Sequence, residues 1–183
     1  AYYGRNGECP VPIISASTPS YCFSAAYEAI RIATQHMTPV ILLSDGYIAN
    51  GAEPWKFPKS DDLPEIKISF AENTLAEGEK FMPYQRDEKL ARPWAIPGTK
   101  GLENRVGGLE KQDITGNISY DSENHQHMVK TRQAKVDLIA NYIPEQTLDS
   151  GANKGKVLVL GWGSTFGAIK SACNELQKEG EEV

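Results

Sequence analysis

Residues 39–51 read Pro39-Val40-Ile41-Leu42-Leu43-Ser44-Asp45-Gly46-Tyr47-Ile48-Ala49-Asn50-Gly51. The apolar run predicts a strand from Val40 to Ser44, and its continuity is typical of a central parallel strand buried on both faces. Asp45 and Gly46 follow at the carboxyl end of that strand, which is the edge where open α/β sheets collect their ligands. Asp45 is therefore a candidate ligand or proton-handling group. The alternative is an Asx turn, in which the Asp45 side chain only caps the backbone.

A short strand at residues 11–15 and a long helix are predicted just before this run. Thr18 has a hydroxyl that can cap a helix, and Pro19 fits the first helical position, where no amide donor is needed. Apolar residues then follow the 3.6-residue period to about Met37. They form one stripe of Cys22, Ala25, Ala26, Ala29, Ala33 and Met37, and a second stripe of Phe23, Tyr27 and Ile30. Such a helix is expected to pack between a sheet and another body.

Residues 51–120 form an irregular middle segment. Its prolines, at positions 54, 58, 64, 83, 93 and 97, are too closely spaced for long helices or strands. Aromatic residues are nevertheless spread through it, from Trp55 to Trp94, and disordered linkers are poor in aromatics. A long connection of this kind is unusual in an isolated compact domain. We expect it to be ordered and to wrap a neighbouring surface, such as a partner subunit.

A second α/β segment follows. A polar helix is predicted from about Asn124 to Tyr142, with an apolar stripe through Val129, Val136, Ile139, Ala140 and Ile143. Residues 156–160 read as a buried strand, residues 161–167 as a glycine-rich turn, and the next helix as ending at Gly180. Residues 181–183 resemble the start of another strand. One strand and one helix cannot bury their own apolar faces, so the chain is expected to be an internal piece of a larger protein.

The glycine-rich turn allows two interpretations. Gly161 and Gly163 match the first positions of a dinucleotide-binding GxGxxG motif, but Phe166 occupies the third and Gly167 comes one residue late. The favoured alternative is a tight strand-to-helix turn whose glycines permit close packing.

Metal ligation is not predicted. His125 and His127 form an HxH pair, but on a helix their imidazoles diverge, and a solvated helix start beside acidic residues is the preferred interpretation. His36 falls at a helix end, where a cation or a donor to a carbonyl is favourable. Cys9, Cys22 and Cys173 are far apart in sequence, which argues against a CxxC motif or a disulfide framework. The basic residues from Arg86 to Arg105 are interleaved with acidic ones, a pattern typical of a solvated or interface surface.

The composition limits the functional classes. The 183 residues carry a net charge of −5, which disfavours nucleic acid as a partner. No apolar run approaches the roughly 20 residues of a membrane helix, and the first residues do not form a secretory signal. We therefore expect a cytoplasmic α/β protein that needs neither membrane nor nucleic acid.

Three stretches together resemble the alpha subunit of 2-oxoacid:ferredoxin oxidoreductases, most closely the 2-oxoglutarate type. The first runs from Tyr3-Gly4-Arg5-Asn6-Gly7-Glu8 through Ser17-Thr18-Pro19-Ser20 to residues 38–51. The second comprises Tyr84-Gln85-Arg86-Asp87-Glu88, Ala91-Arg92-Pro93-Trp94-Ala95-Ile96-Pro97-Gly98 and Gly107-Gly108-Leu109-Glu110. The third is Gly161-Trp162-Gly163-Ser164-Thr165-Phe166-Gly167. The second stretch is the most specific, because no general α/β pattern demands it.

The resemblance implies parallel sheets with flanking helices and three parts. Residues 1–58 would be the later half of a thiamine-diphosphate pyrimidine-binding domain. Residues 59–155 would be the irregular connection with its one helix near 124–142. Residues 156–183 would be the first strand and helix of a transketolase C-terminal-like domain.

The same resemblance implies an enzyme that oxidatively decarboxylates a 2-oxoacid to acyl-CoA and reduces ferredoxin. Thiamine diphosphate with magnesium would lie at the interface with a beta subunit, which commonly carries an iron–sulfur cluster. The family's glutamate at the aminopyrimidine ring and its 2-oxoacid-binding arginine fall before Ala1, so the piece alone is expected to be inactive and to bind no cofactor. Tyr3, Arg5, Asn6 and Asp45 are its candidate cofactor-binding residues.

Two other interpretations stay open. One is a non-catalytic α/β nucleotide-binding module that uses the glycine turn. The other is the beta-type subunit of a lipoamide-linked 2-oxoacid dehydrogenase, which has the same order of two domains.

Overall fold

The computed structural model describes residues 1–73 and 75–183. The chain divides into two compact units, each assembled from three stretches. Unit 1 comprises Ala1–Pro12, Ile30–Val40 and Pro64–Ile143, and unit 2 comprises Ile13–Ala29, Ile41–Leu63 and Pro144–Val183. Among the described residues, no helix has both the length and the apolar character needed to cross a membrane.

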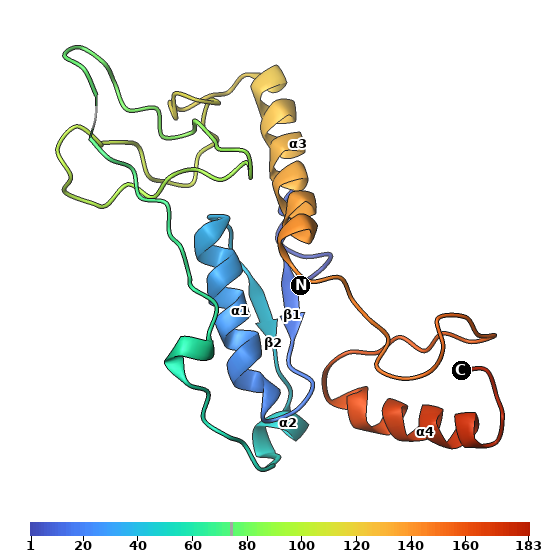
Figure 1. The fold of residues 1–183 in the computed structure, drawn as a ribbon. Helices are drawn as coiled ribbons and strands as arrows, with labels where there is room; N and C mark the ends of the chain where they lie inside the picture. Colours follow the sequence, from blue (N-terminus) through green and yellow to red (C-terminus); the bar gives the residue numbers. More distant parts are fainter. Residues whose placement is uncertain (74) are drawn as a thin grey trace. The chain divides into compact units, whose positions relative to one another are not determined.

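Unit 2 contains a small parallel β–α–β arrangement. Strand β1 (Ile13–Ser15) pairs in parallel with β2 (Ile41–Leu43), in a register that places Ile14 opposite Leu42. Helix α1 (Tyr21–Gln35) connects them, and its first half belongs to this unit (Figure 1). Its residue Ala25 is fully buried in a core with Ala16 and Ile48. The predicted α/β class with parallel strands is confirmed.

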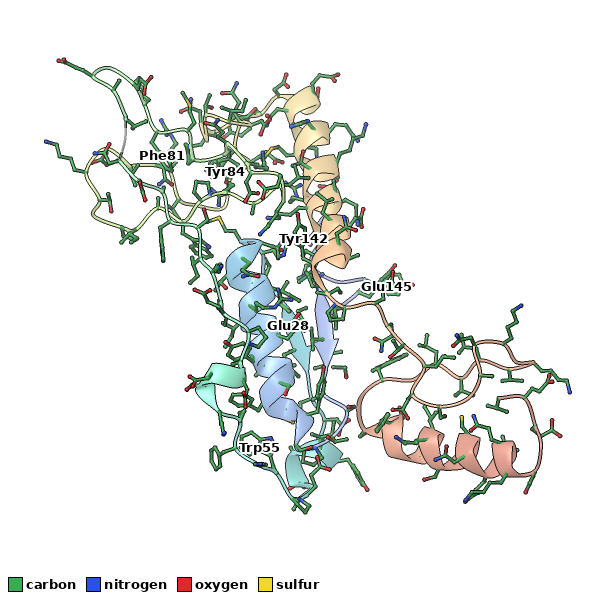
Figure 2. The ribbon with its side chains drawn as sticks, in the orientation of Figure 1. Glu28, Trp55, Phe81, Tyr84, Tyr142 and Glu145 are labelled. Carbon is green, nitrogen blue, oxygen red and sulfur yellow. The ribbon has the colours of Figure 1, made fainter. Side chains whose placement is uncertain are left out.

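The start of α1 agrees with the predicted cap. The Tyr21 amide donates to the Thr18 hydroxyl at 3.2 Å, which satisfies one of the free amides of the first turn. Glu53 supports the same corner, because its carboxylate accepts from the Ser20 amide at 2.5 Å. Trp55 packs near Phe23 with ring centroids 5.6 Å apart (Figure 2). The irregular segment therefore begins by covering the first turns of α1.

The remaining elements of unit 2 are short, except for one helix. They are α2 (Gly46–Asn50), η1 (Ser60–Asp62), η3 (Gly163–Thr165) and α4 (Phe166–Lys178). The predicted helix after the glycine turn is thus present as α4. Gly163 adopts φ +67°, a left-handed conformation that favours glycine, as the turn interpretation requires. At Gly161 an added Cβ would meet the end of the Ile169 side chain, so this glycine lets α4 approach closely.

The predicted strand at residues 156–160 is not formed. The segment has no ladder partner among the described residues, and its apolar side chains are exposed, with Leu160 at 82%. A strand needs a neighbour to satisfy its backbone groups and a layer to bury its face. The amides of Lys156 and Val157 both donate to the Glu182 carbonyl, so residue 182 lies beside this run.

Unit 1 is built on α3 (Ser122–Leu138), which continues into η2 (Ile139–Tyr142). Asp121 caps α3 by accepting from the Asn124 amide at 2.7 Å. Met128 and Ile139 are its buried apolar residues, so the predicted stripe is correct at Ile139 but omitted Met128. The part of the irregular segment from Pro64 onward, drawn from green to yellow in Figure 1, belongs to the same unit. Its described residues, 64–73 and 75–120, carry isolated bridges, as between Tyr84 and Ile114, and no strand.

His36 follows directly after α1, where the sequence predicted a cation or a donor to a carbonyl, but the structure places it in the interior. The side chain is 1% exposed and lies edge-on to Tyr142, with ring centroids 5.2 Å apart. Burial lowers the pKa of His36, and the nearby Lys89 and Arg31 cations lower it further. The imidazole is therefore favoured in its neutral form and acts as a core residue.

The glycine turn gives a direct test of the fold. Gly163→Val should lower the free energy of unfolding by about 1–3 kcal/mol, because a β-branched residue is strained at positive φ. Urea denaturation measures the change. Gly167→Ala is the matched control, since a Cβ there meets open space inside a helix and should be neutral or slightly stabilising. Equal destabilisation by both substitutions would contradict the conformational argument.

Candidate functional site

A strained loop opens unit 1. Arg5, Asn6 and Gly7 have φ values of 58°, 65° and 91°, so three consecutive residues are left-handed, two of them without the freedom of glycine. The Arg5 guanidinium closes the loop by donating to the carbonyls of Ala1 at 2.6 Å and Cys9 at 2.9 Å. Strain of this kind persists only where surrounding contacts fix it, and it concentrates at functional positions.

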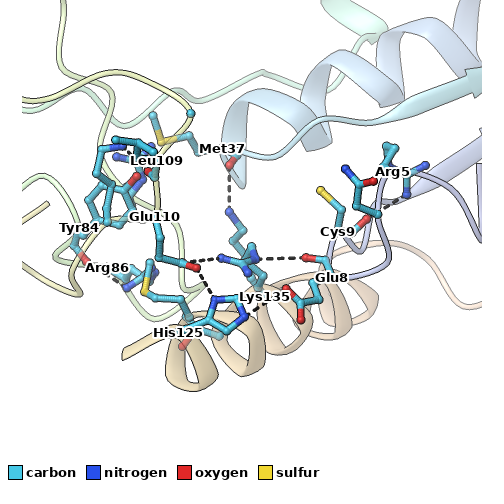
Figure 3. A pocket seen from close by; sticks show the side chains of 17 residues that line it. Arg5, Glu8, Cys9, Met37, Tyr84, Arg86, Leu109, Glu110, His125 and Lys135 are labelled. Atoms are coloured by element: carbon cyan, nitrogen blue, oxygen red, sulfur yellow. Dashed lines mark hydrogen bonds and ion pairs between the residues drawn. The ribbon is translucent and has the colours of Figure 1, made fainter. Parts of the chain in front are cut away.

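The loop borders a cavity of about 480 Å³ that lies within unit 1 (Figure 3). Its wall is formed by the N-terminal loop, the irregular segment and one side of α3. The basic side chains on this wall are Arg5, Arg86, Arg92, Lys111, Arg132 and Lys135, and the acidic ones are Glu8 and Glu110. We call this space the unit-1 cavity.

Lys135 holds a central position among the cations. It extends from α3 and donates to the Met37 carbonyl at 2.9 Å. Burial lowers its pKa to about 8, and the neighbouring guanidinium groups of Arg92, Arg86 and Arg132 contribute to the shift. Lys135 therefore exchanges its proton close to neutral pH, unlike an exposed lysine.

The arginines on the wall are held in fixed orientations. Arg92 lies 4.2 Å from the Tyr84 ring centroid and donates to the Pro83 carbonyl at 3.1 Å. Arg86 forms an ion pair with Asp113 and also donates to the Tyr84 carbonyl. Stacking and carbonyl contacts position a guanidinium group without removing its charge.

Glu110 is the acidic counterpart at one side of the cavity. It accepts from His125 Nδ1 at 2.5 Å and from Arg132 Nη1 at 3.2 Å. Burial alone would raise the pKa of Glu110, but these two hydrogen bonds outweigh it and hold the pKa below its usual value. The pKa of His125 is raised, first by the hydrogen bond to Glu110 and then by the charge of Glu8.

The sequence-derived candidates separate in the structure. Arg5 and Asn6 line the unit-1 cavity, whereas Tyr3 is 92% exposed and contacts Tyr2 edge-on. Asp45 belongs to unit 2, where it caps α2 by accepting from the Ile48 amide at 2.9 Å. A hydrogen bond from the Ser164 side chain and this cap lower the pKa of Asp45. That geometry is the one the Asx-turn interpretation describes, and a ligand role for Asp45 stays a prediction.

The wall includes residues that sequence reasoning placed elsewhere or did not single out. Arg86 and Arg92 were expected on a solvated or interface surface and not in an anion-binding site, and both are partly buried against Tyr84 on the cavity wall. Arg132 and Lys135 were not singled out, although their spacing of three places them on one side of a helix. His125 and His127 bind different carboxylates, those of Glu110 and Asp113, as diverging imidazoles should.

Comparison with known proteins identifies the class. The family model described as "Pyruvate flavodoxin/ferredoxin oxidoreductase, thiamine diP-bdg" matches residues 1–129. The chain belongs to this family, which confirms the resemblance inferred from its three sequence stretches.

Individual relatives refine the comparison. The chain is 50% identical to "2-oxoglutarate oxidoreductase subunit KorA" of Mycobacterium tuberculosis, with 100% of the chain and 27% of that protein covered. It is 30% identical to "2-oxoacid:ferredoxin oxidoreductase 1, subunit alpha" of Aeropyrum pernix, with 97% of the chain and 27% of that protein covered. A solved 2-oxoglutarate:ferredoxin oxidoreductase from Magnetococcus marinus, with 2-oxoglutarate, coenzyme A and succinyl-CoA bound, matches at a TM-score of 0.80 and 26% identity. That match covers 100% of the chain and 31% of the solved chain, so the chain spans about a third or less of these relatives.

The ion pair between His125 and Glu110 can be tested by titration. The pKa of His125 should lie above 6.5 in the wild type, and Glu110→Gln should lower it, because the main group that favours the imidazolium is then gone. NMR of the histidine ring signals as a function of pH measures both values. Glu123→Gln, in the first turn of the same helix, is the control and should leave the titration unchanged. Identical titration of wild type and Glu110→Gln would show that the pair does not form.

Proposed function

We propose that this chain is part of the alpha subunit of a thiamine-diphosphate-dependent 2-oxoacid:ferredoxin oxidoreductase. The observation that carries the proposal is similarity along nearly the whole chain, including the irregular segment, to a 2-oxoglutarate oxidoreductase subunit and to the alpha subunit of a 2-oxoacid:ferredoxin oxidoreductase. The complete enzyme would oxidatively decarboxylate a 2-oxoacid, transfer the acyl group to coenzyme A and pass the electrons to ferredoxin. The 50% identity to a 2-oxoglutarate oxidoreductase subunit supports 2-oxoglutarate as its substrate.

The proposed cofactor is thiamine diphosphate with magnesium at an interface with a beta subunit that carries an iron–sulfur cluster. The proposed cofactor-binding residues of this chain stay Tyr3, Arg5, Asn6 and Asp45, and none of them is assigned to the thiamine ring system. The unit-1 cavity is walled by six Lys and Arg side chains against two Glu, a charge that suits the diphosphate of the cofactor better than its cationic thiazolium. The irregular segment and the exposed apolar run at 157–160 suit a chain covered by other parts of the same enzyme. The cytoplasm is the proposed location.

Two other functions are less well supported. A nucleotide-binding module would use the turn at residues 161–167, but Gly163 is explained there by a turn conformation close to Asp45 and Ser15. A lipoamide-linked dehydrogenase subunit would share the domain order, but the relatives above are named as 2-oxoglutarate or ferredoxin oxidoreductase subunits.

The function is tested on the complete alpha subunit purified with its partner subunit. We expect 2-oxoglutarate to reduce ferredoxin or a viologen dye only when coenzyme A is present. A panel of pyruvate, 2-oxobutyrate and branched 2-oxoacids defines the substrate class, and succinyl-CoA formation confirms the product. An enzyme that reduces NAD through a lipoyl acyltransferase, and no ferredoxin or dye, would contradict the proposal and support the lipoamide-linked alternative.

A further inference from the structure

The unit-1 cavity has a charge opposite to that of the chain. The chain carries a net charge of −5, yet the cavity wall has six Lys and Arg side chains against two Glu. These cations come from three separate stretches: the N-terminal loop, the irregular segment and α3. Charged residues so far apart in sequence are gathered only by the fold. A concave surface that concentrates one sign of charge focuses its field on a ligand of the opposite sign.

Besides Arg5, three of these cations are fixed by uncharged acceptors. Lys111 is 4% exposed and donates to the carbonyls of Gly107 and Leu109. Lys135 and Arg92 are likewise bound by backbone carbonyls. Within residues 1–73 and 75–183, none of the three has a carboxylate at ion-pair distance. A carbonyl holds a cation in place but leaves its full charge, so the wall keeps a surplus of positive charge.

The surplus of positive charge lowers the pKa of Lys135. After burial, the largest influences that lower its pKa to about 8 are the guanidinium groups of Arg92, Arg86 and Arg132, while Asp87 acts in the opposite direction. Like charges that share one cavity wall destabilise one another unless an anion lies among them. Burying cations without partners is costly, and proteins retain such arrangements where a ligand completes them.

We propose that the unit-1 cavity binds a phosphate group of an organic phosphate, with Lys135 and Arg92 as its main ligands. A phosphate carries up to two charges on three strong acceptor oxygens, which suits several cations better than one carboxylate would. Arg92, stacked on Tyr84, presents its planar fork in a fixed orientation. The Lys135 ammonium adds a point charge from α3. This inference stands on the cavity itself and does not depend on the proposed function.

The test uses the complete subunit and inorganic pyrophosphate as the probe, with isothermal titration calorimetry as the readout. Lys135→Met should weaken pyrophosphate binding about tenfold or more, the loss expected for one charge-assisted contact. Lys130→Met is the matched control, because Lys130 is exposed on the same helix and is not on the cavity wall, and it should bind as the wild type does. Arg92→Lys keeps the charge but loses the fork, and an intermediate loss is expected. Circular dichroism confirms that each variant is folded.

The pH dependence gives a second readout. Lys135 is charged below pH 8, so pyrophosphate should bind tightly there and more weakly as the pH rises through about 8. Near that pH, binding should take up protons, which calorimetry in buffers of different ionisation enthalpy detects. Lys135→Met should lack this uptake, whereas Lys130→Met should retain it.

Competition identifies the source of the phosphate. Displacement of pyrophosphate from the wild type by coenzyme A or by thiamine diphosphate identifies the compound that carries the phosphate group. Displacement by neither would contradict an organic phosphate as the ligand. Equal affinity of wild type and Lys135→Met for pyrophosphate would overturn the proposal. It would also be overturned if 2-oxoglutarate displaced pyrophosphate at lower concentration than any phosphate compound, because the cavity would then be a carboxylate site.

Discussion

The side-chain amide of Asn124 is the contact on which unit 1 depends. It donates to the Lys111 carbonyl at 3.0 Å and accepts from the Asp113 amide at 3.0 Å, so one side chain pairs both kinds of backbone group of a segment whose described residues form isolated bridges and no strand. Backbone groups left unpaired away from water are costly, and a segment with so few ladders must satisfy them by other means. Asn124 also lies in the first turn of α3, where its backbone amide donates to the Asp121 carboxylate. Helix capping and attachment of the irregular segment therefore share one residue.

The charged contacts of unit 1 extend this attachment along α3. Glu110 and Asp113 lie on either side of Lys111 in sequence, and both accept hydrogen bonds from side chains of α3. Glu110 accepts from His125 and Arg132. Asp113 accepts from His127. The carboxylates of Glu110 and Asp113 are thereby paired with side chains of α3. The cations that remain are held by carbonyls, and this division gives the cavity its positive wall. The same interactions that attach the irregular segment to α3 thus create the electrostatic character of the unit-1 cavity.

The local elements were largely predictable from the sequence. The cap at Thr18, the strand at Ile41–Leu43 and the positive φ of Gly163 follow from rules that act over a few residues. The cavity was not predictable, because Arg92 and Lys135 are distant in sequence and no periodicity connects them. The predicted strand at 156–160 was wrong because its apolar pattern shows only that the run can be buried. A strand also needs a neighbouring strand to pair with its backbone, and that is not a local property of the sequence. His36 belongs to the same group, since burial beside Tyr142 favours the neutral imidazole over the cation that a helix end would stabilise.

The loop at Arg5 has a consequence for how this segment can change over evolutionary time. The Arg5 side chain closes the loop, and the Arg5 backbone must adopt a left-handed conformation in that same loop. Glycine or asparagine would relieve the backbone but lose the closure, and most other replacements would lose the closure and keep the strain. Almost every single substitution at Arg5 is therefore expected to destabilise the loop. We expect such a residue to change only together with its neighbours, so that the loop is replaced as a whole and not residue by residue.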